Sequence, residues 1–277
     1  MSDELKKEIS LLPETQNSKL KTKVVLVLEY DGTNYCGFQF QTNGPTVQDE
    51  VEKALSKLTG ENIRIVASSR TDTGVHARGQ VISFWTGSNL NIGTFVKGLN
   101  YYLPQDIAVQ ASYKVYDKFS VQRDAVSREY RYLIFNGPNR SPLKRGSTYH
   151  VRDELDIEEM NKASQLLVGE HDMASFVTEI KRSAVKSTLR KIYAACTKRK
   201  GNLVIFFITG RSFLPHQVRN TVGTLIRVGL GKVSVQDFKA IMEEKKPGLA
   251  GPTVPAQGLY LMKVSYPRPL GDYYEDL

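Results

Sequence analysis

The segment Ser68–Gln80 concentrates side chains that could do chemistry. It places the carboxylate of Asp72 between the guanidiniums of Arg70 and Arg78, with the imidazole of His76 close by. A polar loop between strand-like segments more often carries binding or catalytic residues than residues that only support the fold. An aspartate beside an arginine stays ionised and oriented, which suits a nucleophile or a base acting at a sugar carbon. The alternative is that Asp72 only caps a turn while the arginines lie in solvent.

Tyr130, Tyr132 and Arg219 are the residues farther along the chain that could complete such a site. Aromatic side chains near the carboxylate can stack on a nucleobase. The segment 128–132 also alternates charged residues with rings, a pattern that an edge strand would show equally well. Both interpretations remain open from the residues alone.

Several classes of site are not indicated. The four histidines show no HxxxH or HxH spacing, and we expect no metal site. The phosphate-binding patterns GxxxxGK[ST] and GxGxxG are absent, as is GxSxG, so we expect no organic cofactor. Two cysteines, Cys36 and Cys196, are too few for a disulfide framework and favour a reduced, cytoplasmic protein. We expect no secretory signal and no membrane contact, because no apolar run approaches the length of a membrane span.

The chain is basic. Its 38 Lys and Arg outweigh 29 Asp and Glu and give a net charge of +9. The first 23 residues carry five lysines against four acids, and the last seven carry three acids, so the excess belongs to the part between them. A basic folded body favours a polyanionic partner such as nucleic acid.

Residues 1–23 are polar and aperiodic, and we interpret them as a mobile tail. Hydrophobic periodicity then predicts a strand, a helix, two strands, a helix and a strand. Their ranges are Val24–Tyr30, Thr46–Leu58, Ile63–Ala67, Gln80–Trp85, Ile92–Leu103 and Ile107–Tyr113. Thr46 as N-cap and Gly60 past the end delimit the first helix.

The second half repeats this order, with one extra helix before its last strand. The predicted ranges are Arg128–Phe135, Asp156–Val168, the hairpin Arg190–Lys198 and Leu203–Thr209, the helices His216–Val228 and Val235–Glu244, and the strand Gly258–Tyr266. The apolar run Ile205–Ile208 suits a strand covered on both faces. Each half is a βαββαβ, ferredoxin-like unit. We therefore predict an α+β protein with lobes at 24–122 and 123–277, sheets joined edge to edge, and a basic cleft between the lobes for RNA.

Six segments together resemble the tRNA pseudouridine synthase A (TruA) family. They follow the family's order and cover essentially Val24 to Pro267, and the element RTDxGVHA is highly specific. The segments are Glu29–Gly32, Gly37–Gln39, Arg70–Ala77, Tyr130–Tyr132, Phe213–Asn220 and Gly258–Leu261.

The resemblance implies a pseudouridine synthase fold and the isomerisation of uridine in the anticodon stem-loop of tRNA, at tRNA positions 38–40. Asp72 matches the family's catalytic aspartate, and Arg70 the arginine that takes the place of the flipped base. Tyr130 matches the tyrosine that stacks on the uracil, Arg219 the arginine that pairs with the aspartate, and Leu259 the residue that shapes the base pocket. The resemblance also implies a homodimer. Whether the aspartate adds to C1′, attacks C6 or takes the C2′ proton stays open.

This chain departs from the family at a few positions. Ser69 stands where glycine is usual, Thr73 where alanine is common, and Phe38 where tryptophan is usual. In the segment Phe119–Arg123, Gln122 occupies the position of a family arginine and Arg123 comes one residue late. If this segment is a strand, Arg123 faces the opposite side, so that RNA contact is not carried over.

Two rival functions remain. An RNA-binding protein without catalysis would share the basic charge and the aromatic residues, but it would have no reason to combine Arg70, Asp72, Tyr130 and Arg219. A glycoside hydrolase also applies carboxylates to a sugar C1′, but it ordinarily needs a second acid near the first. The segment Ser68–Gln80 has none.

Overall fold

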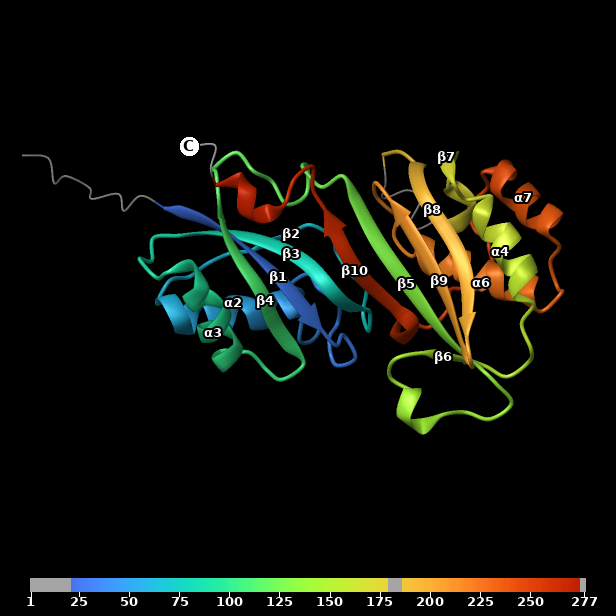
Figure 1. The fold of residues 1–277 in the computed structure, drawn as a ribbon, viewed down its shortest axis with the longest axis horizontal. Coiled ribbons are helices and arrows are strands. Elements are labelled where there is room, and N and C mark those ends of the chain that lie inside the picture. The colour runs from blue at the N-terminus through green and yellow to red at the C-terminus, as the bar shows by residue number, and fades with distance from the viewer. Residues whose placement is uncertain (1–20, 179–185, 275–277) are drawn as a thin grey trace, which may run out of the picture.

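The computed structural model describes residues 21–178 and 186–274. Within them, ten strands form one sheet in the order β4-β1-β3-β10-β5-β9-β8-β7, with β2 on β3 and β6 on β5 (Figure 1). The strands are β1 (Thr22–Tyr30), β2 (Val66–Ala67), β3 (His76–Thr86), β4 (Ile107–Val115), β5 (Ser127–Asn136), β6 (Tyr149–Val151), β7 (Gly169–Asp172), β8 (Leu189–Lys200), β9 (Leu203–Gly210) and β10 (Leu259–Ser265). The α-helices are α2 (Val47–Thr59), α3 (Ile92–Tyr102), α4 (Ile157–Gln165), α6 (Gln217–Gly229) and α7 (Val235–Glu244).

The predicted α+β class and the repeated unit are confirmed in the sheet order. In the first half, β4, β1, β3 and β2 lie side by side, and β10, β5, β9 and β8 repeat this order in the second. The two sheets join where β10 runs parallel to β3, with Tyr260 opposite His76 and Leu261 opposite Ala77. All other pairings are antiparallel except that of β6 with β5. Strands from both halves of the chain therefore meet where the two sheets join.

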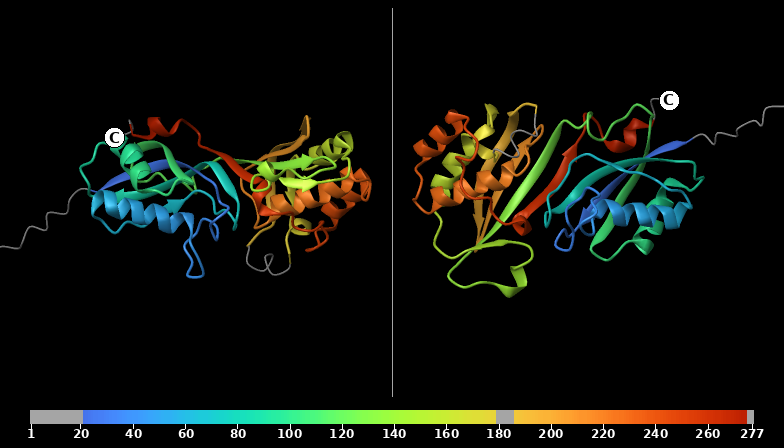
Figure 2. Two further views of the ribbon diagram at one scale, coloured as in Figure 1. Left: turned by 90° about the horizontal axis from the view of Figure 1, so that it is seen from below. Right: turned by 180° about the vertical axis from the view of Figure 1, so that it is seen from behind.

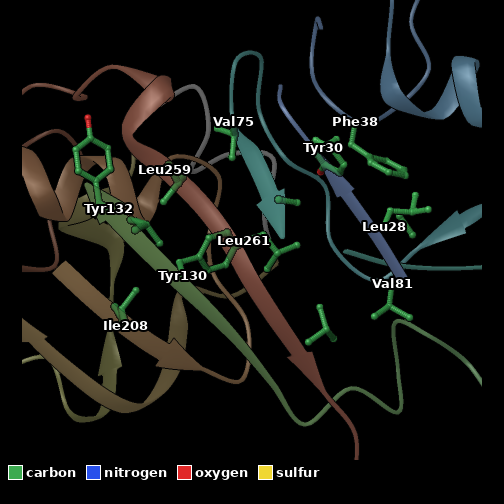
Figure 3. Close-up of a cluster of buried hydrophobic side chains, with 14 of the residues drawn as sticks. Leu28, Tyr30, Phe38, Val75, Val81, Tyr130, Tyr132, Ile208, Leu259 and Leu261 are labelled. Carbon is green, nitrogen blue, oxygen red and sulfur yellow. The ribbon is translucent and has the colours of Figure 1, made fainter. Parts of the chain in front are cut away.

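The helices pack on one face of the sheet, which is turned toward the viewer in the right-hand view of Figure 2. Along β5 and β9 the even-numbered side chains are buried beneath them and the odd-numbered ones are half-buried on the opposite, open face. Ile205 and Phe207 lie on the open face, so the prediction that 205–208 is covered on both faces is wrong. The buried apolar side chains continue across the junction of β3, β10 and β5 (Figure 3).

Local sequence signals set the helix ends. The Thr46 side chain accepts a hydrogen bond from the backbone N–H of Asp49, and Gly60 ends α2 at a φ of 74°. That left-handed conformation is what favours glycine at this position. Helix α4 begins after Asp156 as predicted but ends at Gln165, three residues before the predicted end.

Strand boundaries differ where tertiary pairing intervenes. Of the predicted strand Ile63–Ala67 only β2 pairs with β3, because the N–H of Ile65 bonds to the Glu52 carboxylate instead. Strand β3 begins at His76, four residues before the prediction, because β1 and β10 both pair with Ala77. Strand β1 begins at Thr22, so Thr22 and Lys23 are not part of a tail. Residues 1–20 of that predicted tail lie outside the described residues.

No helix among the described residues is long and apolar enough to cross a membrane.

Candidate active site at the junction of the two halves

The loop before β3 is held in place through its backbone. The C=O of Asp72 accepts a hydrogen bond from the N–H of Val75 at 3.1 Å, and Gly74 supplies the positive φ of 75° that this turn needs. The backbone N–H of Phe38 donates a hydrogen bond to the Thr71 carbonyl at 3.1 Å. The side-chain hydroxyls of Thr71 and Tyr30 are hydrogen-bonded to each other at 2.8 Å. A Cβ at Gly37 would approach the Thr71 carbonyl oxygen to 2.8 Å, so this close contact needs glycine. The position of Asp72 is thus fixed by its neighbours.

The Asp72 carboxylate is not used to cap the turn. Its Oδ2 accepts a hydrogen bond from Arg219 Nη1 at 3.3 Å, although 147 residues separate the two in the chain. Arg219 Nε donates to the C=O of Val254 at 2.8 Å, which orients the guanidinium. The Asp72 side chain remains 34% exposed, so one carboxylate is both anchored and open to a ligand.

A second partner of Asp72, His216, was not among the predicted site residues. Its Nε2 lies 3.4 Å from the same Asp72 oxygen, and the pair is ionic when the imidazole is protonated. His216 precedes α6 in the left-handed conformation, with a φ of 60°. Such a backbone costs free energy in a non-glycine residue and is most often kept at functional sites. Its place inside the family-like segment Phe213–Asn220 was the signal in the sequence that could have indicated it.

A hollow of about 510 Å³ opens beside Asp72. All five predicted site residues line it, namely Arg70, Asp72, Tyr130, Arg219 and Leu259. Tyr130 packs edge-on against Phe213 with ring centroids 5.2 Å apart, and Leu259 is buried beneath the hollow's surface. We call this space the base hollow, because a carboxylate beside aromatic and aliphatic walls suits a flat base attached to a sugar.

Burial raises the pKa of the Tyr130 phenol to about 12, a shift opposed by a hydrogen bond with Ser69 and by the Arg128 charge. The phenol is therefore neutral near pH 7, where it can offer a ring face and a hydrogen-bonding group but not a phenolate.

The structure separates His76 and Arg78 from Asp72. Arg78 and His76 line a different hollow, which is bordered by open-face residues such as Glu29 and Arg131. The His76 Nδ1 lies 3.0 Å from an Asp31 carboxylate oxygen, and its ring stacks on Tyr260 at 4.6 Å. Of the two guanidiniums in the loop, only that of Arg70 reaches the base hollow.

Arg128 is the second site residue that sequence reasoning missed. Strand β5 lies between β10 and β9, so the edge-strand interpretation of 128–132 is wrong. The Arg128 side chain is 9% exposed, and desolvation lowers its pKa. Its guanidinium donates to five oxygens, none of them a carboxylate: Ser69 Oγ at 3.3 Å, and the carbonyls of Ser68 at 3.1 Å, Gln122 at 3.1 Å, Ala125 at 3.3 Å and Arg211 at 2.8 Å.

These five bonds tie together three separate segments: the loop before Asp72, the connection between the two halves, and the approach to α6. The hydroxyl of Ser69, where the family usually has glycine, accepts one of them. The sequence could not indicate this, because an arginine within an alternating strand is ordinarily a surface residue.

The segment Phe119–Arg123 forms turns, not a strand, and the backbone N–H of Asp124 closes one of them on the Ser120 carbonyl at 3.0 Å. Gln122 lines the base hollow and its side-chain amide donates to the Ala67 carbonyl at 2.9 Å. Arg123 is exposed. The opposite-face argument for this position therefore does not apply, and Gln122 has a structural contact at the edge of the site.

Comparison with known proteins agrees with this geometry. Residues 26–122 and 163–267 match the family described as tRNA pseudouridine synthase. The chain thus falls in the class of pseudouridine synthases, isomerases that act on uridine in tRNA.

The similarity to individual relatives is more specific. The chain is 43% identical over 243 residues to the tRNA pseudouridine synthase A of Acetivibrio thermocellus, with 88% of this chain and 99% of the relative covered. It is 39% identical over 244 residues to the protein of the same name from Francisella tularensis subsp. novicida, with 88% and 94% covered. This chain belongs to the tRNA pseudouridine synthase A family.

Solved structures give weaker similarities. One is an H/ACA RNP bound to a substrate RNA containing 2′-deoxyuridine, at 13% identity and a TM-score of 0.36, with 74% of this chain and 44% of that chain covered. Another is a Cbf5-Nop10-Gar1 complex, at 15% identity and a TM-score of 0.35, with 73% and 45% covered. The chain thus spans less than half of each of these two solved chains.

Proposed function

We propose that this protein converts uridine to pseudouridine in the anticodon stem-loop of tRNA, at positions 38–40, with Asp72 as the catalytic aspartate. The observation that carries the proposal is the carboxylate of Asp72, anchored by Arg219 at 3.3 Å and 34% exposed at the wall of the base hollow. The relatives named tRNA pseudouridine synthase A support the substrate class.

Each of the other site residues has a distinct task in this proposal. Tyr130 stacks on the uracil and Leu259, from the same half of the chain, shapes the pocket around it, while Arg219 keeps the carboxylate aimed. Arg70 is exposed at the rim of the hollow and fills the gap that the flipped base leaves in the RNA. Unstacking a base costs a few kcal/mol, which the inserted and stacking side chains offset.

The atoms of the reaction balance without a second reactant. The bond from N1 to C1′ breaks, the uracil turns within the hollow, and C5 bonds to C1′. The proton on C5 is then lost, and N1 gains one. The base hollow keeps the detached uracil close to the sugar during this exchange, which favours recombination over escape.

We also propose that the two halves act as lobes, 24–122 and 123–277, with the RNA between them. The first supplies Arg70 and Asp72, and the second supplies Tyr130, Arg219 and Leu259. The support is that the base hollow is lined from both sides of the β3–β10 junction. A net charge of +9 favours binding of a polyanion along such a cleft.

Release of tritium from C5-labelled uridine in tRNA tests the function directly. We expect release to rise with time and enzyme, and to occur on anticodon stem-loops whose single labelled uridine is at position 38, 39 or 40. Stem-loops with the uridine elsewhere should release none. Binding of tRNA without any release would instead indicate an RNA-binding protein, and release from other positions alone would contradict the site specificity.

We propose further that the protein is a homodimer. Half-buried apolar side chains gather on the open face of β5 and β9, where none of the described α-helices covers them: Leu133, Phe135, Leu203, Ile205 and Phe207. Apolar patches of this kind mark interaction surfaces. Sedimentation equilibrium should give twice the chain mass of 31.1 kDa. A single-chain mass at every concentration tested would contradict the dimer.

A further inference from the structure

A second hollow of about 580 Å³ adjoins the base hollow, with Arg70 between the two. The two spaces share one wall, formed by Arg70, Thr71, Asp72, His216 and Arg219. The opposite wall of the second hollow is the segment 36–41, which the proposed reaction does not use. We call this second space the flanking hollow.

The segment that walls the flanking hollow is held in shape by bonds to its surroundings. The backbone N–H of Cys36 donates to the Pro45 carbonyl at 2.8 Å, and that of Phe40 donates to Gln48 Oε1 at 3.0 Å. The Gln41 side-chain amide donates back to the Cys36 carbonyl. A wall anchored in this way is organised before any ligand arrives.

Phe40 presents an aromatic surface on this wall. The side chain is 45% exposed, an arrangement that water alone does not favour for a large apolar ring. The Arg64 guanidinium lies over the ring, 5.5 Å from its centroid, and Arg64 is itself held by Glu52 at 2.7 Å. A cation over one region of the ring orients it and adds positive charge near a prospective phosphate.

The rest of the wall is polar. Gln39 and Gln41 are exposed beside Phe40, and their amides can donate to and accept from the edge of a base. An aromatic platform flanked by amides and arginines is the arrangement with which proteins bind unstacked bases of single-stranded loops.

We propose that the flanking hollow binds the base of a nucleotide adjacent to the target uridine, stacked on Phe40. The inference rests on the proposed function, since it takes the target uracil to lie in the base hollow with its sugar at Asp72. The RNA strand continues from that sugar across Arg70, whose exposed side chain separates the two hollows. Because the two hollows adjoin, the neighbouring nucleotide of the same strand then lies at the flanking hollow.

The test combines protein and RNA changes in a double-mutant cycle. The proteins are wild type, Phe40→Ala, Phe40→Tyr and the control Tyr101→Ala, which removes an 82% exposed ring from α3. The RNAs are an anticodon stem-loop and variants that each carry one abasic nucleotide on either side of the target. Dissociation constants and single-turnover rates of tritium release are measured for every pair.

We expect Phe40→Ala to weaken stem-loop binding about tenfold, as the loss of one stacked base predicts. Phe40→Tyr should restore binding and Tyr101→Ala should leave it unchanged. At one flanking position, removal of the base should weaken binding to wild type by the same factor of about ten. The same abasic RNA should bind Phe40→Ala no more weakly than the intact RNA does. Additive losses at every flanking position, or wild-type affinity of Phe40→Ala, would overturn the proposal.

Failure of this inference and failure of the proposed function look different. If wild type releases tritium from the unmodified stem-loop but no abasic position is coupled to Phe40, only the flanking hollow is misassigned. If wild type binds the stem-loop and releases no tritium, the proposed function itself is wrong.

Discussion

Asp72→Asn is expected to abolish isomerisation while the protein still folds and binds tRNA. Asparagine has the shape of aspartate, and its amide oxygen can still accept the hydrogen bond from Arg219. It cannot ionise, so it provides neither a nucleophilic oxygen nor a base. Single-turnover tritium release should fall by about 10⁴-fold. The partly exposed ion pair contributes little to folding, so the free energy of unfolding should change by about 1 kcal/mol or less.

Glu243→Gln is a matched control for this experiment. It removes one negative charge from an exposed pair with Lys239 on α7, at an Nζ–Oε1 distance of 3.7 Å. We expect wild-type rates and wild-type tRNA affinity from this variant. Turnover by Asp72→Asn above a hundredth of the wild-type rate would remove Asp72 from the chemistry, and loss of tRNA binding would assign it to recognition.

The second large effect is expected for Arg128→Met, which keeps the length of the side chain and removes all five donors. Five oxygens in three segments would then lack this partner, and the bonds to the Ser68 and Ala125 carbonyls are buried. Each buried polar group left unpaired costs about 1–3 kcal/mol, reduced where water enters. We expect the free energy of unfolding to fall by about 3 kcal/mol or more, and the melting temperature with it.

The activity of Arg128→Met should fall by more than its loss of stability explains. The Arg128 guanidinium binds the Ser68 carbonyl, where the loop that carries Asp72 begins, so its removal should displace that loop. At a temperature where Arg128→Met is fully folded, we expect kcat to drop and KM to change less. Arg128→Lys keeps the charge but has only three donors and one nitrogen, so it should recover part of the stability and little of kcat. Arg78→Met, which removes an exposed arginine from β3, serves as the control. Equal rates for folded Arg128→Met and wild type would contradict the positioning role.

Much of the fold followed from local patterns. The capping residue Thr46 predicted where α2 begins, because an N-cap satisfies backbone N–H groups within its own turn. The alternating and apolar runs predicted eight of the ten strands that the structure describes, and the short strands β6 and β7 were missed. The repeated order predicted the repeated sheet. The ends of β1, β2 and β3 were predicted less well, since they depend on which strand pairs with them. The pairing strands are distant in the sequence, so local patterns do not indicate them.

By itself, the sequence determined the residue types of the site. Arg70 and Asp72 in one loop, and Arg219 and Leu259 in two distant segments, already implied an aspartate-based pseudouridine synthase through their resemblance to the family. The local turn at Gly74 was also within reach, because a positive φ is a property of one residue and its neighbours.

Only the tertiary structure decided which of these side chains share a space. Side chains of a strand alternate between faces, so the pairing of β3 with β10 sets His76 and Arg78 apart from Asp72. The same junction brings Arg219 across 147 residues to the carboxylate. Packing between the halves also places His216 beside Asp72 and buries the Arg128 guanidinium against Ser68 and Ser69 of the loop. Such contacts depend on register and packing between distant segments, which no local pattern encodes.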